Sequence, residues 1–313
     1  MIAFFTPPTV PNGGRGAEGY QRYRLMHNIE AKTILSAKNG MNLYRGCTHG
    51  CIYCDSRSDC YGMDHEFEDI AVKSNAIELL EDALRRKRKP CMIGTGSMCD
   101  PYMHCEEKLE LTRRALEVID KYNCGVTVIT KSDRILRDID LYEQINRHSK
   151  AVIQMTLTTA DENLCRIIEP NVCTTHRRYE VLKEFQRLGI PTVVWLCPIL
   201  PYINDTVENL NGILDYCFDA GVKGIINFGF GVTLRAGNRE YFYRKQDEHF
   251  PGMKERYIRR FGDSYECASE NSASLWKLFT DRCRKAGVMT SPDEIFAYLH
   301  EYPVKNGQLS LFG

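Results

Sequence analysis

The chain has 313 residues, of which 43% are hydrophobic, so it is long enough to bury a large core. Its 41 Lys and Arg residues are balanced by 41 Asp and Glu residues, which disfavours a protein that coats DNA but allows local basic surfaces. The 14 cysteines lie mostly singly, with no evident signal peptide or membrane-spanning run. This pattern disfavours a disulfide framework and predicts a reduced, cytoplasmic protein.

Short runs rich in β-branched residues alternate with longer amphipathic patterns up to about residue 230. The expected strands are Met41–Tyr44, Cys91–Thr95, Val126–Thr130, Ala151–Thr158, Thr192–Cys197 and Gly224–Phe228. The expected helices are Ala71–Arg86, Glu106–Tyr122, Asp133–Asn146, Thr175–Leu188 and Thr206–Ala220, with Gly189 and Gly221 at helix ends. This alternation predicts an α/β fold with a parallel sheet and right-handed crossovers. Six strands instead of eight indicate an open, partial (β/α)6 barrel.

The chain beyond the sixth expected strand is dominated by helical patterns. Helices are expected near Lys254–Phe261, Ala273–Lys285 and Pro292–Glu301, where they would cover the open side of the barrel. The predicted division is an N-terminal extension (residues 1–34), a barrel core (35–238), a C-terminal helical extension (239–302) and a flexible tail (303–313).

The carboxyl ends of the strands are where a parallel barrel carries its chemistry. Six loops should therefore converge, and they are rich in polar residues, glycine and proline. They are residues 47–54, 94–102, 131–132, 158–159, 198–205 and 229–237. The sequence predicts a functional site at this end of the barrel.

The first of these loops carries Cys47, Cys51 and Cys54 in the spacing C-x3-C-x2-C. Three thiolates on one tight loop can hold three corners of a [4Fe–4S] cluster and leave the fourth iron open to a ligand that is not protein. Structural zinc usually takes paired C-x2-C knuckles, and only one such pair is present. A zinc site would need a further ligand, for which Cys60 is the candidate.

Five segments taken in order resemble the radical S-adenosylmethionine (SAM) superfamily, and within it the spore photoproduct lyase-like branch, also described as DNA repair photolyase-like. They are residues 44–55, 94–102, 129–132, 166–170 and 198–205. The cysteine motif points to the superfamily and the other segments to the branch. In such enzymes the amino and carboxylate groups of SAM chelate the open iron. An electron from the cluster then cleaves SAM to methionine and a 5′-deoxyadenosyl radical.

The resemblance implies a SAM site around the cluster. Tyr53 matches an aromatic position near the adenine, Lys131 a lysine placed to meet the SAM carboxylate, and Thr156 a position near the ribose. Glu169 and Arg178 match recurring polar positions near the same site. The loop that approaches the methionine end contributes Gly94, Thr95, Gly96, Ser97 and Asp100. As alternatives, Lys131 could be a solvated strand-end lysine and Arg178 could pair with glutamates of its own helix on the surface.

One position departs from the branch. Spore photoproduct lyases use a cysteine in the loop after the second strand to return a hydrogen atom to the substrate radical, but Ser97 occupies the matching position here. Cys99 and Cys105 follow closely and are the candidates for that catalytic role. Ordinary buried thiols would explain both residues equally well.

Candidate partner surfaces lie toward the C-terminus. Basic residues interleaved with tyrosines could contact nucleic acid, and these are Arg235, Arg239, Arg244, Lys245, Lys254, Arg256, Arg259 and Arg260. The segment Gln308–Phe312 resembles the peptide with which bacterial DNA polymerases bind the sliding clamp. A reductant such as flavodoxin or ferredoxin is expected to supply the electron.

These features predict a radical SAM enzyme whose radical abstracts hydrogen from a substrate, with a nucleic acid base favoured in a lyase or repair reaction. The alternatives are the same initiation on a protein, peptide or small molecule, and a non-catalytic metal-binding protein associated with DNA. Analysis of iron and sulfide separates the last alternative from the enzyme.

Overall fold

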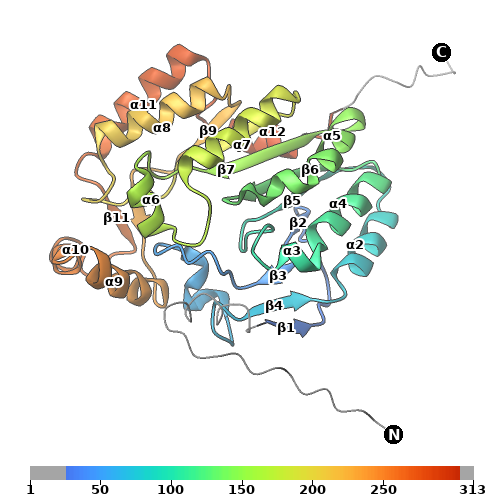
Figure 1. Ribbon diagram of the computed structural model, residues 1–313, viewed down its shortest axis with the longest axis horizontal. Helices are drawn as coiled ribbons and strands as arrows, with labels where there is room; N and C mark the ends of the chain where they lie inside the picture. Colours follow the sequence, from blue (N-terminus) through green and yellow to red (C-terminus); the bar gives the residue numbers. More distant parts are fainter. Residues whose placement is uncertain (1–25, 304–313) are drawn as a thin grey trace, which may run out of the picture.

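A six-stranded parallel sheet forms the centre of the molecule (Figure 1). The computed structural model describes residues 26–303. In spatial order the strands are β2 (Gly40–Met41), β5 (Met92–Thr95), β6 (Gly125–Thr130), β7 (Ala151–Thr156), β8 (Thr192–Trp195) and β9 (Gly224–Ile226). Every neighbouring pair is parallel, which confirms the predicted partial (β/α)6 barrel.

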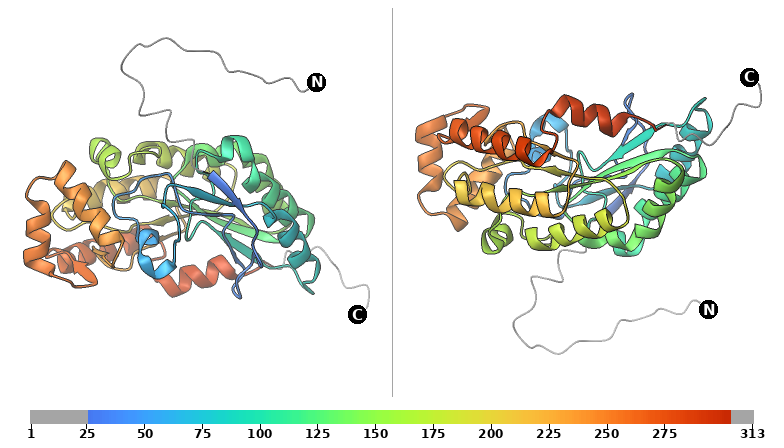
Figure 2. Two further views of the ribbon diagram at one scale, coloured as in Figure 1. Left: turned by 90° about the horizontal axis from the view of Figure 1, so that it is seen from below. Right: turned by 90° about the horizontal axis from the view of Figure 1, so that it is seen from above.

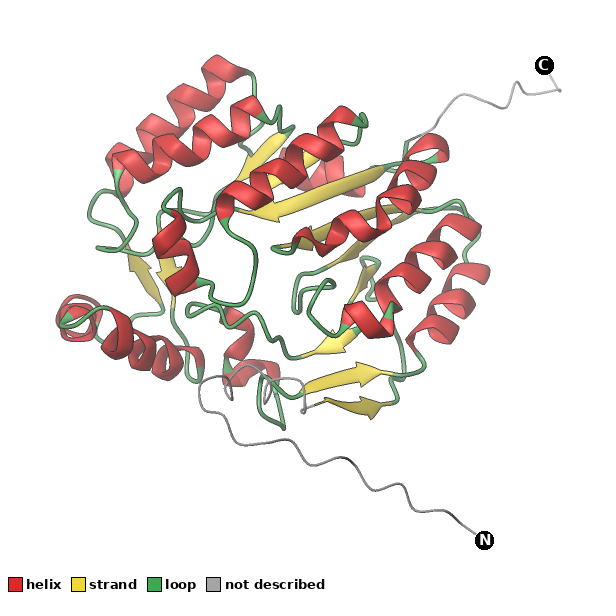
Figure 3. Cartoon of the chain, viewed as in Figure 1, coloured by secondary structure: helices red, strands yellow, loops and turns green. Residues whose placement is uncertain are grey.

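Helices cover the convex face of this sheet. They are α2 (Ala76–Arg85), α4 (Leu111–Lys121), α5 (Ile139–His148), α7 (Thr175–Arg187) and α8 (Val207–Asp219). Because successive side chains of a strand point to opposite faces, Ile153 and Met155 of β7 pack in the main core with these helices, whereas Val152 faces the other way. Figure 3 shows these helices lying alongside the strands, and the strand labelled β7 in Figure 1 points its arrowhead toward the loops that gather at the centre of the molecule.

The C-terminal part consists of β10 (Gly231–Thr233), α9 (Asn238–His249), α10 (Met253–Phe261), β11 (Glu266–Ala268), α11 (Ser272–Ala286) and α12 (Pro292–His300). Helix α11 packs beside α8, α9 and α10 pack with the cysteine loop, and α12 covers the concave face of the sheet. Ile295 and Leu299 of α12 pack against Val152, Val193 and Ile226 of the barrel strands. Figure 2 shows α12 on the side of the sheet opposite α5 and α7.

A second, smaller sheet carries the cysteine loop and corrects two expectations. Its order is β1 (Met26–Ile29), β4 (Ile70–Lys73) and β3 (Tyr44–Arg45). The single strand expected at Met41–Tyr44 is wrong, because the chain passes from β2 in the barrel to β3 in this sheet. The helix expected from Ala71 is also wrong at its start. Buried Ile70 and Val72 place that segment in β4, which pairs on both edges, and α2 begins at Ala76.

Other boundaries differ for local reasons. The helix expected at Glu106–Tyr122 breaks at Glu110, whose φ of 47° separates α3 (Glu106–Leu109) from α4. The Glu106 carboxylate accepts the Thr112 backbone N–H at 2.9 Å and so satisfies a donor of the first turn of α4. The helix expected from Asp133 begins as the 3-10 helix η3 (Asp133–Asp138). Helix α6 (Glu162–Ile168) and the antiparallel pair β10–β11 were not expected. Among the described residues, no helix is long and apolar enough to cross a membrane.

Candidate functional site

The loop that carries the three cysteines leaves β3 and enters the 3-10 helices η1 (Asp55–Arg57) and η2 (Asp59–Tyr61). The Cys47 N–H donates to the Phe67 carbonyl at 3.0 Å, and the Ile52 N–H donates to the Ile168 carbonyl at 3.0 Å. The loop is therefore supported by the segment before β4 on one side and by the C-terminal end of α6 on the other. Residues 166–170, one of the segments that carry the resemblance, thus lie beside the cysteine loop.

The thiols of Cys47 and Cys51 are buried, and Cys54 is half-buried. Burial raises the pKa of Cys51 to about 12 and that of Cys47 well above its usual value, so metal ligation is needed to make these thiols anionic. Between them in the sequence lies His49, whose Nε2 is buried and has no hydrogen-bond partner among the described residues. Three thiols on one loop beside an unpartnered ring nitrogen fit a [4Fe–4S] cluster with one open iron. Cys60 is exposed, unlike these three cysteines.

Lys131 follows β6 and faces the cysteine loop. Its Nζ lies 5.9 Å from the centroid of the Tyr53 ring. Burial lowers the pKa of Lys131, but its electrostatic interactions with the Cys51 sulfur and the Glu169 carboxylate outweigh that effect and raise it. A cation is therefore stabilised next to the loop, where the resemblance implies a carboxylate of SAM.

A buried ion pair joins the loop to two barrel strands. Arg178 and Glu169 are both fully buried, and Nη1 of Arg178 lies 2.5 Å from Oε2 of Glu169. Arg178 also donates to the backbone carbonyls of Thr156, at 3.0 Å, and Lys131, at 3.1 Å. The Tyr53 hydroxyl donates to the Glu169 carboxylate. Tyr53, Thr156 and Lys131 are thus connected through the Glu169–Arg178 pair.

The surface pairing considered for Arg178 is wrong, and its neighbour makes that contact instead. Arg177 lies on the exposed side of α7 and contacts Glu180 and Asp133 at 2.7 and 2.9 Å. Neither sequence spacing nor residue type distinguishes the two adjacent arginines, since the difference depends on which side of α7 faces the sheet.

The loop after β5 is held against β6 by Asp100. Its carboxylate accepts hydrogen bonds from the Thr130 hydroxyl at 2.7 Å and from the Lys131 N–H at 2.8 Å. Gly96 has a φ of 99°, and a Cβ on it would lie 2.0 Å from the Ile129 carbonyl oxygen. Only glycine allows this close approach to β6. Gly94 and Thr95 end β5, so all five loop residues named for SAM lie at the carboxyl end of that strand.

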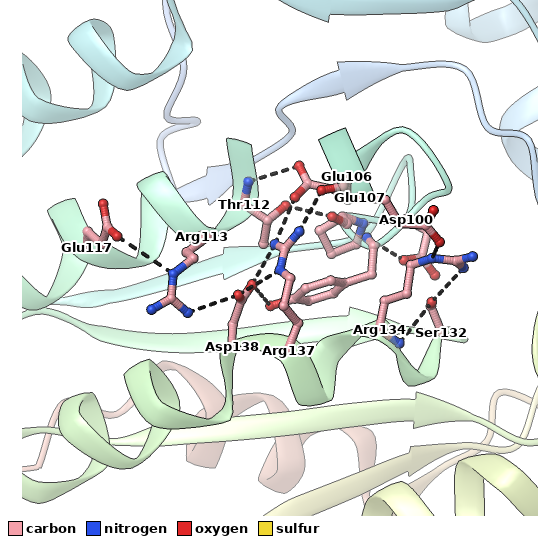
Figure 4. Close-up of polar contacts among 12 residues, drawn as sticks. Asp100, Glu106, Glu107, Thr112, Arg113, Glu117, Ser132, Arg134, Arg137 and Asp138 are labelled. Atoms are coloured by element: carbon pink, nitrogen blue, oxygen red, sulfur yellow. Dashed lines mark hydrogen bonds and ion pairs between the residues drawn. The ribbon is translucent and has the colours of Figure 1, made fainter. Parts of the chain in front are cut away.

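Figure 4 shows the polar network that supports the far side of this loop. Glu106 and Asp138 are fully buried, and Arg137 contacts both carboxylates, at 3.0 and 2.7 Å. Arg113 of α4 adds a contact of 3.2 Å to Asp138. The Tyr44 hydroxyl, at the start of the cysteine loop, donates to Glu106. The network therefore links the loops after β3, β5 and β6.

The two cysteines named as hydrogen-atom donors both pack in the main hydrophobic core. The Cys99 thiol is buried and lies 3.1 Å from the Tyr44 carbonyl, to which it donates, and burial raises its pKa to about 12. Cys105 is half-buried and packs against the same core. Ser97 is exposed. A further thiol, Cys197, follows β8 and is half-buried; its isolated position in the sequence gave no signal.

The concave face carries a polar line and an aromatic group. Gln154 donates to the Thr127 hydroxyl at 2.6 Å and accepts from the Trp195 indole N–H at 2.7 Å. The ring centroid of Trp195 lies 5.9 Å from that of Phe228 and 6.1 Å from that of Phe296. Phe228 is 62% exposed, although it lies only two residues after the end of β9. The alternation along β8 could have identified Trp195, but Phe296 comes from α12 and is joined to it only by folding.

Some of the basic residues named for nucleic acid contact instead bind other groups of this protein. Arg239 donates to the backbone carbonyls of Leu234, Gly262, Asp263 and Ser264, and Arg256 lies over the Tyr202 ring at 3.5 Å. The clamp-like segment Gln308–Phe312 lies outside the described residues.

Residues 41–238 match the family model of the radical SAM superfamily. The chain belongs to this superfamily. Its cofactors are a [4Fe–4S] cluster and SAM, and it is a radical SAM enzyme. An uncharacterised protein of Methanocaldococcus jannaschii is 32% identical over 247 residues, which cover 78% of this chain and 85% of that protein. An uncharacterised protein of Mycobacterium tuberculosis is 26% identical over 240 residues, covering 74% and 69%.

Solved structures of spore photoproduct lyase share the fold of this radical SAM enzyme. The enzyme complexed with dinucleoside spore photoproduct superposes with a TM-score of 0.60 at 13% identity, covering 91% of this chain and 87% of that one. A variant with bound SAM and the same dinucleoside gives a TM-score of 0.59 at 12% identity, with the same coverage. The structural part of the predicted resemblance is confirmed.

Proposed function

We propose that Cys47, Cys51 and Cys54 hold the cluster and that SAM binds against the 94–100 loop, with Lys131 pairing with its carboxylate. When bound, the cluster and SAM supply a 5′-deoxyadenosyl radical that abstracts hydrogen from the substrate. The support for this assignment is the convergence of the thiols, the half-buried Lys131 cation and the glycine-containing loop at one end of the barrel. Tyr53 would then face the adenosine while its hydroxyl stays on Glu169.

A triple replacement of Cys47, Cys51 and Cys54 by alanine tests the cluster assignment. The variant should lose both the brown iron–sulfide absorbance and SAM cleavage, because no other cysteines of the chain have this spacing. A matched variant with Cys60→Ala should keep both. Cleavage by the triple variant would exclude these ligands.

We propose a nucleic acid base as the substrate, in a lyase or repair reaction. The observation that carries this proposal is the aromatic group of Trp195, Phe228 and Phe296 on the concave face, with Phe228 largely exposed. Exposed aromatic rings bind unstacked bases, and each stacking contact contributes about 1–3 kcal/mol. Cys197 follows Trp195 by two residues along the same chain, so it joins Cys99 and Cys105 as a candidate hydrogen-atom donor.

Formation of 5′-deoxyadenosine by the anaerobically reconstituted enzyme, with SAM and dithionite, tests the substrate. The additions are none, undamaged DNA, ultraviolet-irradiated DNA with spore-type lesions, and an unrelated peptide. Stimulation by irradiated DNA with loss of lesions supports repair. Stimulation by the peptide alone, or equal slow cleavage in every arm, contradicts a nucleic acid substrate but leaves the superfamily chemistry intact.

Replacement of Phe228 by alanine should weaken the stimulation by DNA about tenfold, as expected for one lost stacking contact. Trp276 is the matched control, because it is an aromatic residue of α11 that is 41% exposed outside the concave face. Trp276→Ala should leave the stimulation unchanged. Equal effects of the two replacements would contradict a base-binding role of Phe228.

Two partner assignments are also proposals. A cavity of about 260 Å³ is lined by Thr48, Gly50 and Ile52 of the cysteine loop, and its charged lining residues include Lys245 and Glu68. We propose that an acidic reductant such as flavodoxin approaches here.

For the sliding clamp, a pull-down should retain the intact chain but not one truncated after Gly307. Equal binding of both chains excludes the clamp motif.

A further inference from the structure

Three potential metal ligands meet at the small sheet, outside the barrel and apart from the three cysteines. His27 lies on β1, while His65 and Asp69 belong to the segment that leads into β4. Nδ1 of His27 is 3.1 Å from Oδ1 of Asp69, and the two imidazole rings have centroids 4.9 Å apart at an angle of 86°. One donor atom from each of the three residues lies within 4.8 Å of the others. All three side chains are partly buried.

The hydrogen bonding of His65 leaves one ring nitrogen ready to bind a metal. Nδ1 of His65 lies 3.0 Å from the backbone carbonyl of Glu66, which can only accept, so Nδ1 carries the proton. Nε2 therefore has a free electron pair. That atom is buried and has no hydrogen-bond partner among the described residues. Metal-binding histidines characteristically donate their other ring nitrogen to a backbone carbonyl or carboxylate, which fixes the tautomer in this way.

We infer that His27, His65 and Asp69 form a Zn²⁺ site, with water as the fourth ligand. Two nitrogen or oxygen ligands at about 2.0–2.1 Å from a tetrahedral ion lie about 3.3 Å apart, close to the observed His27–Asp69 separation of 3.1 Å. The His65 side chain must rotate to bring its Nε2 within coordination distance of the ion, and this movement completes the site. Two imidazoles with one carboxylate favour zinc over magnesium or calcium, which prefer sites made of oxygen alone.

Zinc at this position would fasten the outer support of the cysteine loop. It would join β1 to residues 65–69, and this segment contains Phe67, whose carbonyl accepts the Cys47 N–H. The Gly46 backbone also lies against this segment, since a Cβ on Gly46 would be 2.5 Å from the Phe67 carbonyl oxygen. The role is structural and independent of the proposed substrate.

The test uses the cluster-loaded enzyme, incubated with excess Zn²⁺ and desalted anaerobically. We expect about one zinc per chain by mass spectrometry in addition to the iron. X-ray absorption at the zinc edge should show a nitrogen and oxygen shell at about 2.0 Å with imidazole scattering and no sulfur at about 2.3 Å. Absence of zinc, or a sulfur shell that places zinc in the cysteine loop, overturns the site.

Three variants assign the ligands. His65→Asn and Asp69→Asn should each reduce the bound zinc to background while the iron content stays at the wild-type level. The control is His176→Asn on α7, where the side chain is 54% exposed and its ion pair within the described part of the chain is with Glu180, and it should keep the zinc. Zinc retained by both site variants overturns the inference. If a variant fails to fold, the wild-type spectrum still decides, because sulfur ligation and two-imidazole ligation differ.

Discussion

Replacement of Arg178 by methionine tests whether the buried ion pair supports the site. The change preserves much of the side-chain volume but removes the charge that faces Glu169 at 2.5 Å. It also removes the donors to the carbonyls of Thr156 and Lys131. Because both charged side chains are fully buried, Glu169 cannot reach water when its partner is lost. Breaking a buried pair in this way costs about 3–5 kcal/mol of folding free energy.

The loss should depend on pH with a defined sign. In the wild type, burial raises the pKa of Glu169, but the charges of Arg178 and Lys131 outweigh it and hold that pKa below its usual value. This contribution to stability is therefore present above the unfolded pKa of about 4.3 and is lost as the pH falls through the folded value. In the variant, burial prevails and the pKa rises above the unfolded value. The penalty is then largest near about pH 8 and becomes smaller as Glu169 takes up a proton toward about pH 5.

The assay is anaerobic urea unfolding, followed by tryptophan fluorescence, across this pH range. Arg177→Met is the matched control, because Arg177 is an exposed arginine of the same helix and its ion pairs should contribute at most about 1 kcal/mol. The double variant Glu169→Gln/Arg178→Met should recover part of the loss. Equal destabilisation by the two arginine variants, or a penalty for Arg178→Met that does not change with pH, would refute the reasoning.

Three further outcomes follow from the site. Lys131→Met should raise the KM for SAM by about tenfold to a hundredfold with a smaller change in kcat, measured by 5′-deoxyadenosine formation, as expected for one lost charge-assisted hydrogen bond. Gly96→Ala should destabilise more than Gly189→Ala. Both glycines have a positive φ, but only the Cβ at Gly96 would strike backbone, at Ile129, and thermal unfolding compares the two. Cys197→Ser should fold and cleave SAM. If the Cys197 thiol returns a hydrogen atom to the substrate radical, mass spectrometry should detect altered substrate products from this variant.

The sequence was sufficient for the parts of the fold that depend on local patterns. Six strands alternating with helices gave the barrel, and glycine predicted the ends of two helices, where Gly189 and Gly221 have φ values of 70° and 61°. The small sheet was missed because its strands have two to four residues and pair across more than 25 positions of the chain. Ile70–Lys73 therefore merged with the following helical pattern. Such pairing leaves no periodic signal in a short segment.

The candidate site, like the fold, could be predicted only where its residues lie close together in the sequence. The cysteine spacing is local, so it could be read directly, and the resemblance placed Lys131 and the 94–100 loop at strand ends. The partner of Arg178 could not be read, because Glu169 comes from the end of α6, which was not expected. The aromatic group was missed since Phe228 and Phe296 are far apart in the chain. Contacts between distant elements are set by packing, which a single sequence does not display.

The packing of α12 has a consequence for biosynthesis. This helix contacts β5 and β9 and covers Val152, Val193 and Ile226, yet it is the last helix of the described chain to be synthesised. The start of α12 at residue 292 lies 140 residues after Val152, the first of these residues to be made, and this length takes roughly 7–28 s to translate at about 5–20 residues per second. For that interval the apolar inner surface of the nascent sheet stays uncovered. The newborn polypeptide is thus open to chaperone binding, or to aggregation, until α12 leaves the ribosome.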